Sequence, residues 1–392
     1  MKNFSNYNDF DRKEDYHFES KVVHGALGCE PLTGAVSFPI FQTATFRHKG
    51  LGRSTGFDYS RLQNPTRQEL ERTMAILEHG DEAFAFSSGQ AANMALFTWL
   101  NPGDHIILSD DIYGGTYRIG EDIFGKYGIK FTYVDMGDLD RVKEAVTPET
   151  KMLFVETPTN PMMHIADIRE LSKLARSINA YLVVDNTFLT PYFQRPLELG
   201  ADVVVHSATK YIGGHNDTIA GIVVTSRPEL IEHFHMQLKS HGNGLASLDS
   251  WLLIRGLKTL ALRMEKHNEN AKIVAGWLRK HPKVTKVYYA GFEDHPGHDI
   301  MLKQATGFGG MISFSVDSVE TVKKLLEGVD MILFAESLGG TETLITYPMT
   351  QTHESIPPER REAIGITDKF IRISIGIEHV DDIIRDLEQA LS

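Results

Sequence analysis

The sequence predicts an α/β fold with a mostly parallel sheet, followed by a smaller α+β domain at the C-terminal end. Two observations lead to this prediction. Apolar runs of about five residues alternate with segments of helical periodicity, and these runs are apolar throughout instead of alternating with polar residues. Such runs are typical of strands buried on both faces, as parallel strands between helices are.

The first 60 residues are predicted to form an N-terminal arm with little regular structure. Their periodicity is weak, and Pro31, Gly34, Pro39 and Gly52 interrupt it. The α/β domain is expected over residues 61–255 and the α+β domain over residues 256–392, because 392 residues exceed the usual size of one domain.

The α/β domain is expected to begin with a helix over Thr66–Glu78, whose Leu70, Met74 and Leu77 share one face. The predicted strands are Glu82–Phe86, His105–Leu108, Lys130–Val134, Met152–Glu156, Tyr181–Asp185, Asp202–His206 and Ile219–Val224.

Long helical segments are expected over Ser247–Lys280, and a different rhythm begins after Pro282. The predicted elements there are strands at Val284–Tyr289, Met311–Val316, Ile332–Glu336 and Phe370–Ile375, a helix at Glu320–Gly328 and a closing helix with apolar positions from Val380 to Leu391.

Composition excludes several classes of protein. Hydrophobic residues make up 42% and charged residues 23%, as in soluble globular proteins, and no apolar run approaches the ~18 residues of a membrane-spanning helix. Met1–Asp15 lacks the apolar stretch of a secretory signal, and a single cysteine, Cys29, fits a reducing compartment. A net charge of −12 argues against nucleic-acid binding. We therefore expect a cytoplasmic protein that contacts neither nucleic acid nor membrane.

Polar residues follow three of the predicted strands, at the ends where open α/β sheets bind ligands. The segment Ser87–Ala92 opens a helix and suits an anion. Asp185 needs a partner such as a protonated pyridinium nitrogen or a helix N-terminus, and Lys210 is a candidate amine nucleophile. Singly, each has a structural explanation: a helix cap for Ser87–Ala92 and Asp185, and a solvated lysine for Lys210. Together they match the needs of pyridoxal phosphate (PLP), namely a phosphate site, a ring-nitrogen partner and a Schiff-base lysine.

Several further motifs occur in a fixed order along the chain. They are Asp58–Arg61, Asn64–Arg67, Ser87–Gln90, Tyr113–Thr116, Glu156–Pro161, Val184–Thr187, His206–Tyr211, Glu336–Gly340 and Arg372–Glu378. With these motifs the chain resembles the Cys/Met-metabolism family of PLP enzymes from about Ser20 to its C-terminus. The resemblance implies an aspartate-aminotransferase-like fold (fold type I of PLP-dependent transferases).

The resemblance also implies a role for each matching residue. Lys210 would hold the cofactor and move protons, Asp185 would keep the ring nitrogen protonated, and Arg372 would bind the substrate α-carboxylate through a bidentate fork. The phosphate ligands would be Ser88, Gly89, Gln90, Ser207 and Thr209 of one subunit, with Tyr59 and Arg61 of its neighbour.

Three further roles follow from the resemblance. Tyr113 would stack on the ring and relay a proton, Asn160 would bind the phenolic oxygen, and Glu156 would support that strand end. Each has an alternative: Tyr113 as ordinary packing, Arg372 paired with an internal carboxylate such as Glu378, and Glu156 as a purely structural residue. The expected assembly is a homotetramer of dimers that share their active sites. No metal site is expected.

The expected reaction is γ-elimination of L-cystathionine to cysteine, 2-oxobutanoate and ammonia, with desulfhydration of homocysteine or cysteine as possible side activities. Methionine γ-lyases usually carry cysteine at the position of Gly115 and lack a basic residue at that of Arg118. Arg118 suits a distal carboxylate, with a surface residue as its alternative, and Glu336 and Ser337 are expected near the substrate. Leu62-Gln63 departs from the Ser-Gly that the cystathionine enzymes more often show.

Other activities stay open at this stage. Within the family they are cystathionine γ-synthase, which joins cysteine to an O-acyl-homoserine, and then methionine γ-lyase. A serine hydrolase would use the Ala85–Gly89 turn with Asp185 and His353, but it leaves Lys210 unexplained. A non-catalytic relative would not need Lys210, Asp185 and Arg372, all of which are present.

Overall fold

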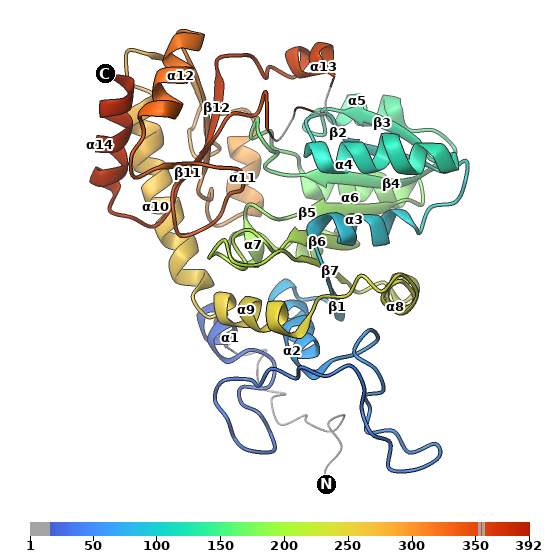
Figure 1. Ribbon diagram of the computed structural model, residues 1–392. Coiled ribbons are helices and arrows are strands. Elements are labelled where there is room, and N and C mark those ends of the chain that lie inside the picture. The colour runs from blue at the N-terminus through green and yellow to red at the C-terminus, as the bar shows by residue number, and fades with distance from the viewer. Residues whose placement is uncertain (1–15, 352–353, 355–356) are drawn as a thin grey trace. The chain divides into compact units, whose positions relative to one another are not determined.

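The computed structural model describes residues 16–392 except 352–353 and 355–356, so part of the predicted arm lies outside the described residues. The chain divides into two compact units. Unit 1 holds Met1–Trp99 and Asp202–Ala261, and unit 2 holds Leu100–Ala201 and Leu262–Ser392. The boundaries expected after residues 60 and 255 stay a prediction. Figure 1 shows the elements of both units.

Unit 1 contains three strands, with β7 (Gly221–Thr225) between β1 (Glu82–Phe86) and β6 (Val203–Ser207). The strand β7 runs antiparallel to both neighbours, and Gly221 lies opposite Phe86 on one side and Ser207 on the other. Because β1 and β6 run in the same direction, their C-terminal ends lie at one edge of the three strands. The polar turns that follow these two strands therefore meet there.

Helices pack around these strands. They are α1 (Phe18–His24), α2 (Pro65–Glu78), α3 (Gly89–Phe97), α8 (Pro228–His241) and α9 (Ser247–Leu257). Asn64 caps α2 by accepting a hydrogen bond from the N–H of Thr66 at 3.0 Å, and proline at the first helical position suits this start. The arm is tied to α2 in turn, since Glu69 accepts from the N–H of Ala26 at 2.8 Å.

Unit 2 begins with a four-stranded parallel sheet in the order β5 (Tyr181–Asp185), β4 (Thr150–Glu156), β2 (His105–Ser109), β3 (Lys130–Val134). The helices α5 (Leu139–Ala145) and α6 (Ile168–Ser177) pack on it through a buried apolar cluster that includes Leu153, Leu171 and Leu182. Five shorter helical segments belong to the same part of the chain. They are α4 (Gly114–Arg118), η3 (Ile119–Ile123), η4 (Phe124–Tyr127), α7 (Thr190–Phe193) and η5 (Pro196–Leu199).

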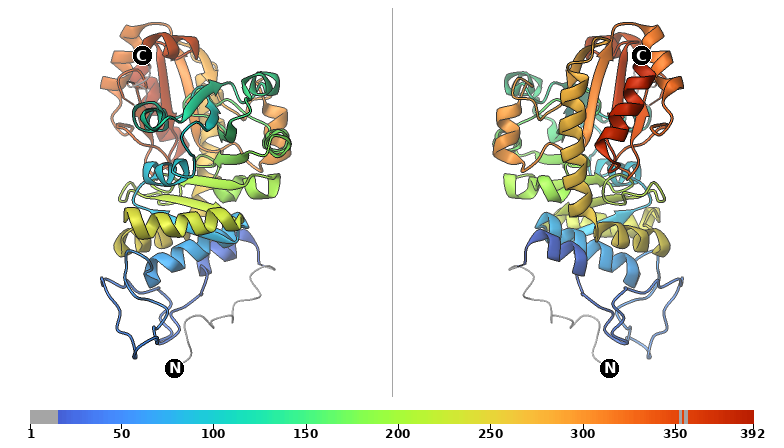
Figure 2. Two further views of the ribbon diagram at one scale, coloured as in Figure 1. Left: turned by 90° about the vertical axis from the view of Figure 1, so that its right-hand side faces the viewer. Right: turned by 90° about the vertical axis from the view of Figure 1, so that its left-hand side faces the viewer.

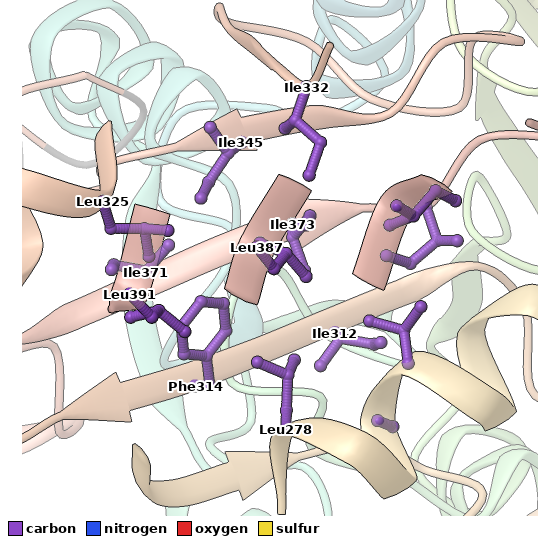
Figure 3. Close-up of a cluster of buried hydrophobic side chains, with 14 of the residues drawn as sticks. Leu278, Ile312, Phe314, Leu325, Ile332, Ile345, Ile371, Ile373, Leu387 and Leu391 are labelled. Atoms are coloured by element: carbon purple, nitrogen blue, oxygen red, sulfur yellow. The ribbon is translucent and has the colours of Figure 1, made fainter. Parts of the chain in front are cut away.

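A second sheet in unit 2 has the order β10 (Leu333–Phe334), β11 (Leu344–Thr346), β12 (Phe370–Ser374), β9 (Met311–Val316), β8 (Val284–Tyr288). The helices α10 (Leu260–Leu278), α12 (Val319–Gly328) and α14 (Val380–Leu391) pack on this sheet. The helices α11 (His298–Gln304) and α13 (Pro358–Ala363) belong to the same part of the chain. Figure 2 shows α10 and α14 beside this sheet. Leu278 and Leu387 of these helices join Phe314 and Ile373 of the strands in one buried core (Figure 3).

Most predicted elements are present, with shifts of one or two residues at their ends. The strand predicted at Ile332–Glu336 is reduced to the two residues of β10, because the following chain turns away toward Ser337. Neither α1 nor β11 was predicted. Among the described residues, no helix is long and apolar enough to cross a membrane.

Candidate active site

In unit 1, the turns after β1 and β6 approach each other closely at Gly221. A Cβ atom on Gly221 would lie 2.2 Å from the carbonyl oxygen of Ser88, and one on Gly89 would lie 3.1 Å from the Cβ of Ser207. Because Gly221 and Gly89 have no side chain, the predicted phosphate ligands Ser88, Gly89 and Ser207 can lie close together.

The same place is the N-terminus of α3, which favours an anion because its first N–H groups point outward. Ser88 caps the helix by accepting from the N–H of Ala91 at 3.0 Å. Thr209 exchanges two hydrogen bonds with the backbone of Ala220, at 3.0 and 3.2 Å, which fixes the second turn. Among the described residues, the buried Oε1 atom of Gln90 has no hydrogen-bond partner. A glycine-lined cradle at a helix N-terminus, with hydroxyls and an amide around it, fits a phosphate group.

Lys210 lies in the turn that follows β6, partly buried. Its N–H donates to the carbonyl of Ser207 at 3.1 Å, and its own carbonyl accepts from Gly214 at 2.7 Å, so the backbone holds the lysine next to the cradle. One residue before Ser207, the fully buried His206 contacts the fully buried Glu78 of α2, with Nε2 and Oε1 2.6 Å apart. This contact fixes the end of β6.

Tyr59 and Arg61 lie in an exposed loop of the arm, with 45% of Tyr59 accessible. The guanidinium carbon of Arg61 lies 5.7 Å from the centre of the Tyr59 ring, and its Nη1 donates to the carbonyl of Lys239. The two side chains predicted to serve a neighbouring subunit are thus adjacent to each other and reachable by solvent.

In unit 2, Glu156 and Asp185 end the parallel strands β4 and β5 and lie opposite each other in the register. Asp185 accepts from the N–H of Thr187 at 3.0 Å and from its hydroxyl at 2.5 Å. Glu156 accepts from the N–H of Asn160 at 2.8 Å and from that of Tyr113 at 3.3 Å. The predicted support by Glu156 therefore reaches both Asn160 and Tyr113 through their backbones.

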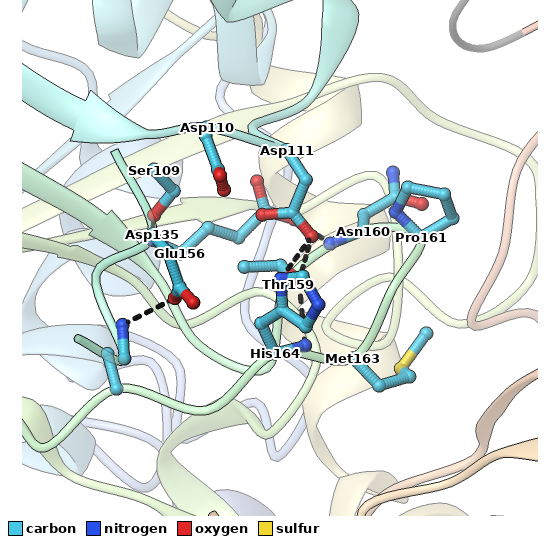
Figure 4. A network of polar contacts seen from close by, with 12 residues as sticks. Ser109, Asp110, Asp111, Asp135, Glu156, Thr159, Asn160, Pro161, Met163 and His164 are labelled. Carbon is cyan, nitrogen blue, oxygen red and sulfur yellow. Dashed lines mark hydrogen bonds and ion pairs between the residues drawn. The ribbon is translucent and has the colours of Figure 1, made fainter. Parts of the chain in front are cut away.

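Burial raises the pKa of Glu156 well above its ordinary value, and the nearby carboxylates of Asp185 and Asp111 raise it further. Asp111 follows β2 and is fully buried beside the hydroxyl of Thr159, which donates to it, and 3.4 Å from Nδ1 of His164 (Figure 4). Burial raises the pKa of Asp111 to about 6. Three acids close together thus disfavour a full set of negative charges, and a proton on Glu156 relieves the repulsion.

Within the described residues, one group has the composition of a metal site. Ligand atoms of Asp110, Asp111 and His164 lie within 4.8 Å of one another. Asp111 already accepts from Thr159 and contacts His164, so these contacts account for the group as part of the polar network (Figure 4).

Arg372 of β12 is 1% exposed, and its guanidinium has three hydrogen-bond acceptors that hold it in place. Nη1 donates to Oδ1 of Asn160 at 2.9 Å, and Nη2 donates to the carbonyl of Ser337 at 2.8 Å and to Oγ1 of Thr346 at 3.1 Å. All three acceptors are uncharged. The alternative partner Glu378 instead accepts from Thr343, at 2.5 Å from its N–H and 2.8 Å from its hydroxyl.

The remaining predicted substrate residues also lie in unit 2. Tyr113 precedes α4 and is 39% exposed, and Arg118 is an exposed residue at the end of that helix. Glu336 is exposed as well, whereas Ser337 is half-buried and has a φ of 113°. A side chain at this φ strains the backbone, and the strained residue is the one whose carbonyl binds Arg372.

The sequence analysis missed the acid Asp111 and the hydroxyl of Thr346, which complete these networks. A sequence signal existed for Asp111, because it follows a buried strand as Asp185 does. Thr346 gave none, since β11 is three residues long. His353, needed for the hydrolase alternative, lies outside the described residues.

Comparison with known proteins agrees with the predicted family. Residues 19–392 match the family of Cys/Met metabolism PLP-dependent enzymes. A cystathionine gamma-lyase of Bacillus subtilis is 48% identical over 370 residues, which cover 94% of this chain and 98% of the relative. A cystathionine beta-lyase of Lactococcus lactis is 48% identical over 373 residues, covering 95% and 98%. A cystathionine gamma-synthase of Haemophilus influenzae is 45% identical over 380 residues, covering 97% and 99%.

The fold agrees as well. The solved structure of cystathionine gamma-lyase from Lactobacillus plantarum, complexed with L-serine, matches with a TM-score of 0.94 and 45% identity, over 96% of this chain and 98% of that one. The predicted fold class is therefore confirmed. The chain belongs to the Cys/Met metabolism family of PLP-dependent enzymes, and pyridoxal phosphate is its cofactor.

Proposed function

We propose that the protein cleaves the Cγ–S bond of L-cystathionine and releases cysteine, 2-oxobutanoate and ammonia. The observation that carries the proposal is the pair of arginines in unit 2. Arg372 is buried and held by uncharged oxygens, whereas Arg118 is exposed on α4, close in sequence to Tyr113. Cystathionine has a carboxylate at each end, so two separate cations suit it.

The residues of unit 1 would bind the cofactor by its phosphate and its aldehyde carbon. Ser88, Gly89, Gln90, Ser207 and Thr209 form the cradle described above, and the Lys210 amine would make the covalent bond. In unit 2, Asp185 would pair with the ring nitrogen, and Asn160 would bind the phenolic oxygen. When bound, the protonated ring withdraws electrons from the substrate Cα and so stabilises negative charge there.

Proton transfer would then fall to two side chains of this protein. The Lys210 amine, released when the substrate binds, would move the Cα proton to C4′ of the cofactor. Neutral again, it would remove a Cβ proton, which expels the sulfur from Cγ. Tyr113 would return a proton to the leaving cysteine sulfur. Glu156 holds the backbone of Tyr113 and Asn160, so it would position both groups without touching the substrate.

Arg372 would orient the substrate through its α-carboxylate. Three hydrogen bonds hold the guanidinium in one direction, and its planar fork matches a carboxylate. After cysteine has left, water would hydrolyse the imine of the four-carbon product to 2-oxobutanoate and ammonia. One cystathionine and one water thus give one cysteine, one 2-oxobutanoate and one ammonia.

The relatives point to two competing reactions of the same substrate class. A β-lyase would break the Cβ–S bond of cystathionine and give homocysteine, pyruvate and ammonia. A γ-synthase would join cysteine to an activated homoserine. The cystathionine beta-lyase relative is as similar as the gamma-lyase, so product identity has to decide.

The first prediction is therefore a product assay on the purified protein. With cystathionine alone, we expect cysteine and 2-oxobutanoate in equal amounts, measured by thiol derivatisation and mass spectrometry of the oxo acids. Pyruvate with homocysteine would contradict the γ-elimination and assign the β-reaction. Faster consumption of O-acyl-homoserine with cysteine would assign the synthase.

The second prediction places the cofactor bond. Borohydride reduction and peptide mapping should find the pyridoxyl group on Lys210, because Lys210 follows the cradle directly. The Lys210→Ala protein should carry no reduced adduct. Lys258→Ala removes a half-buried lysine whose Nζ donates to the carbonyl of Val23 at 2.5 Å, and this variant should label as the unchanged protein does. A label on any other lysine would contradict the assignment.

The third prediction concerns sharing of sites between subunits, for which a dimer is the smallest active unit and a homotetramer the proposed assembly. Arg61→Ala and Lys210→Ala should each be inactive alone. Mixed under conditions that exchange subunits, they should regain up to about half of a normal dimer's sites, since a hybrid holds one site with both residues intact. Exchange shown by mass spectrometry without recovery of activity would contradict shared sites.

The fourth prediction concerns Arg118 and the distal carboxylate. Arg118→Ala should lower kcat/KM for cystathionine by about ten- to a hundredfold, because a charge-assisted hydrogen bond contributes roughly 1.5–3 kcal/mol. Methionine has no distal carboxylate and should be affected far less. Arg141→Ala removes another exposed arginine and serves as the control. Equal losses for both substrates would remove Arg118 from substrate recognition.

A further inference from the structure

Arg67 on α2 lies beneath the loop that carries Tyr59 and Arg61, and no role proposed above uses it. Only 2% of Arg67 is exposed. Its Nη1 donates to the carbonyl of Ser60 at 3.1 Å, and its Nη2 donates to those of Arg61 at 3.4 Å and Leu62 at 2.6 Å. One buried guanidinium therefore binds three successive carbonyls of this loop.

The loop backbone is arranged to make these bonds possible. The carbonyl of Tyr59 accepts from the N–H groups of Leu62 and Gln63, both at 3.0 Å, which closes a tight turn. The three carbonyls that follow Tyr59 point inward to Arg67, while the side chains of Tyr59 and Arg61 are exposed. Holding the carbonyls therefore sets the direction of both side chains.

The other edge of Arg67 faces its own helix. Its Nε lies 3.3 Å from Oε1 of Glu71, and that oxygen accepts from the N–H of Ala85 in β1 at 3.0 Å. Because β1 leads into the Ser87–Gln90 turn, Arg67 could act in two directions, on the loop or on its own phosphate cradle. Three hydrogen bonds of Arg67 go to the loop. Its link to β1 is indirect, because the N–H of Ala85 donates to Glu71 and not to Arg67. We therefore take the loop as the segment that Arg67 positions.

Arginine is the residue type that this arrangement needs. A guanidinium donates in several fixed directions within one plane, whereas a lysine ammonium cannot reach three carbonyls and Glu71 at once. The space is limited too, since a Cβ atom on Gly244 would lie 2.7 Å from Nη1 of Arg67.

We propose that Arg67 is a positioning residue that presents Tyr59 and Arg61 to the cofactor phosphate of the neighbouring subunit. The inference rests on the proposed sharing of sites and adds a requirement to it. Arg67 acts in trans, on the neighbour's cofactor, although all its contacts described above lie within its own unit 1.

The experiment pairs Arg67→Lys with Lys210→Ala. Alone, Arg67→Lys should bind PLP at least about tenfold more weakly than the unchanged protein, measured by cofactor titration. In a hybrid dimer, the intact loop of the Lys210→Ala subunit serves the intact lysine of the Arg67→Lys subunit. Activity should therefore recover to the level of the Arg61→Ala mixture. Arg72→Lys, which changes an exposed arginine on the same helix, should bind PLP normally.

Hydrogen–deuterium exchange provides a readout that does not depend on activity. In the cofactor-free protein, Arg67→Lys should speed exchange of the backbone amides of residues 59–63 and leave residues 87–92 unchanged. Arg67→Gln, whose amide can bind fewer of the three carbonyls, should produce the same pattern and replaces Arg67→Lys if that variant does not fold.

The two mixtures distinguish a failure of the Arg67 role from a failure of the shared active sites. Recovery in the Arg61→Ala mixture but not in the Arg67→Lys mixture would show that Arg67 acts on its own subunit, and the inference would fail alone. Failure of both mixtures would overturn the shared sites and the inference with them. Normal PLP affinity of Arg67→Lys, or faster exchange at residues 87–92 only, would also refute it.

Discussion

A buried charged side chain needs hydrogen-bond partners, and this requirement fixes the backbone around Arg372 in unit 2 and around Arg67 in unit 1. Arg372 obtains its acceptors from three different segments, the loop after β4, the Ser337 turn and β11. Each segment is thereby fixed relative to the others within unit 2. Arg67 does the same in unit 1 for a loop that has no sheet or helix of its own. The hydrogen bonds offset the cost of burying each cation, and they also order backbone that would otherwise be loose.

The buried carboxyl groups of unit 2 lie close to groups of the same charge, unlike the two buried arginines. Glu156, Asp185 and Asp111 lie at the ends of neighbouring parallel strands, where burial and then the charges of the other two acids raise the pKa of Glu156. Adjacent N–H groups of Asn160 and Tyr113 stabilise that carboxyl group in return. A proton on Glu156 removes one of these neighbouring negative charges, which favours the proposed pairing of Asp185 with a pyridinium nitrogen.

Much of this was predictable from the sequence, for identifiable reasons. Buried strands leave runs such as Tyr181–Asp185, and an acid or lysine at the end of such a run is uncommon enough to notice. Strand direction leaves no such trace, so the antiparallel β7 of unit 1 could not be distinguished from the parallel strands of unit 2. A sequence also does not show which side chains bind backbone carbonyls. For this reason Arg67 was named only as part of the Asn64–Arg67 motif, and no role was predicted for it. The reaction within the family could not be predicted from the sequence, because lyases and synthases share nearly all of the matching motifs.

The unusual backbone of Ser337 has a consequence for how this protein would respond to engineering. A φ of 113° costs a serine roughly 1–3 kcal/mol, which a glycine would not incur. Thermostability screens are thus biased toward glycine at this position. The same substitution would make the backbone carbonyl of residue 337, which accepts from Arg372, more mobile. The selected enzyme would then be more stable to heat, and its proposed binding of the substrate carboxylate by Arg372 would be weaker. Directed evolution of this scaffold therefore meets a trade-off at a residue that need not touch the cofactor.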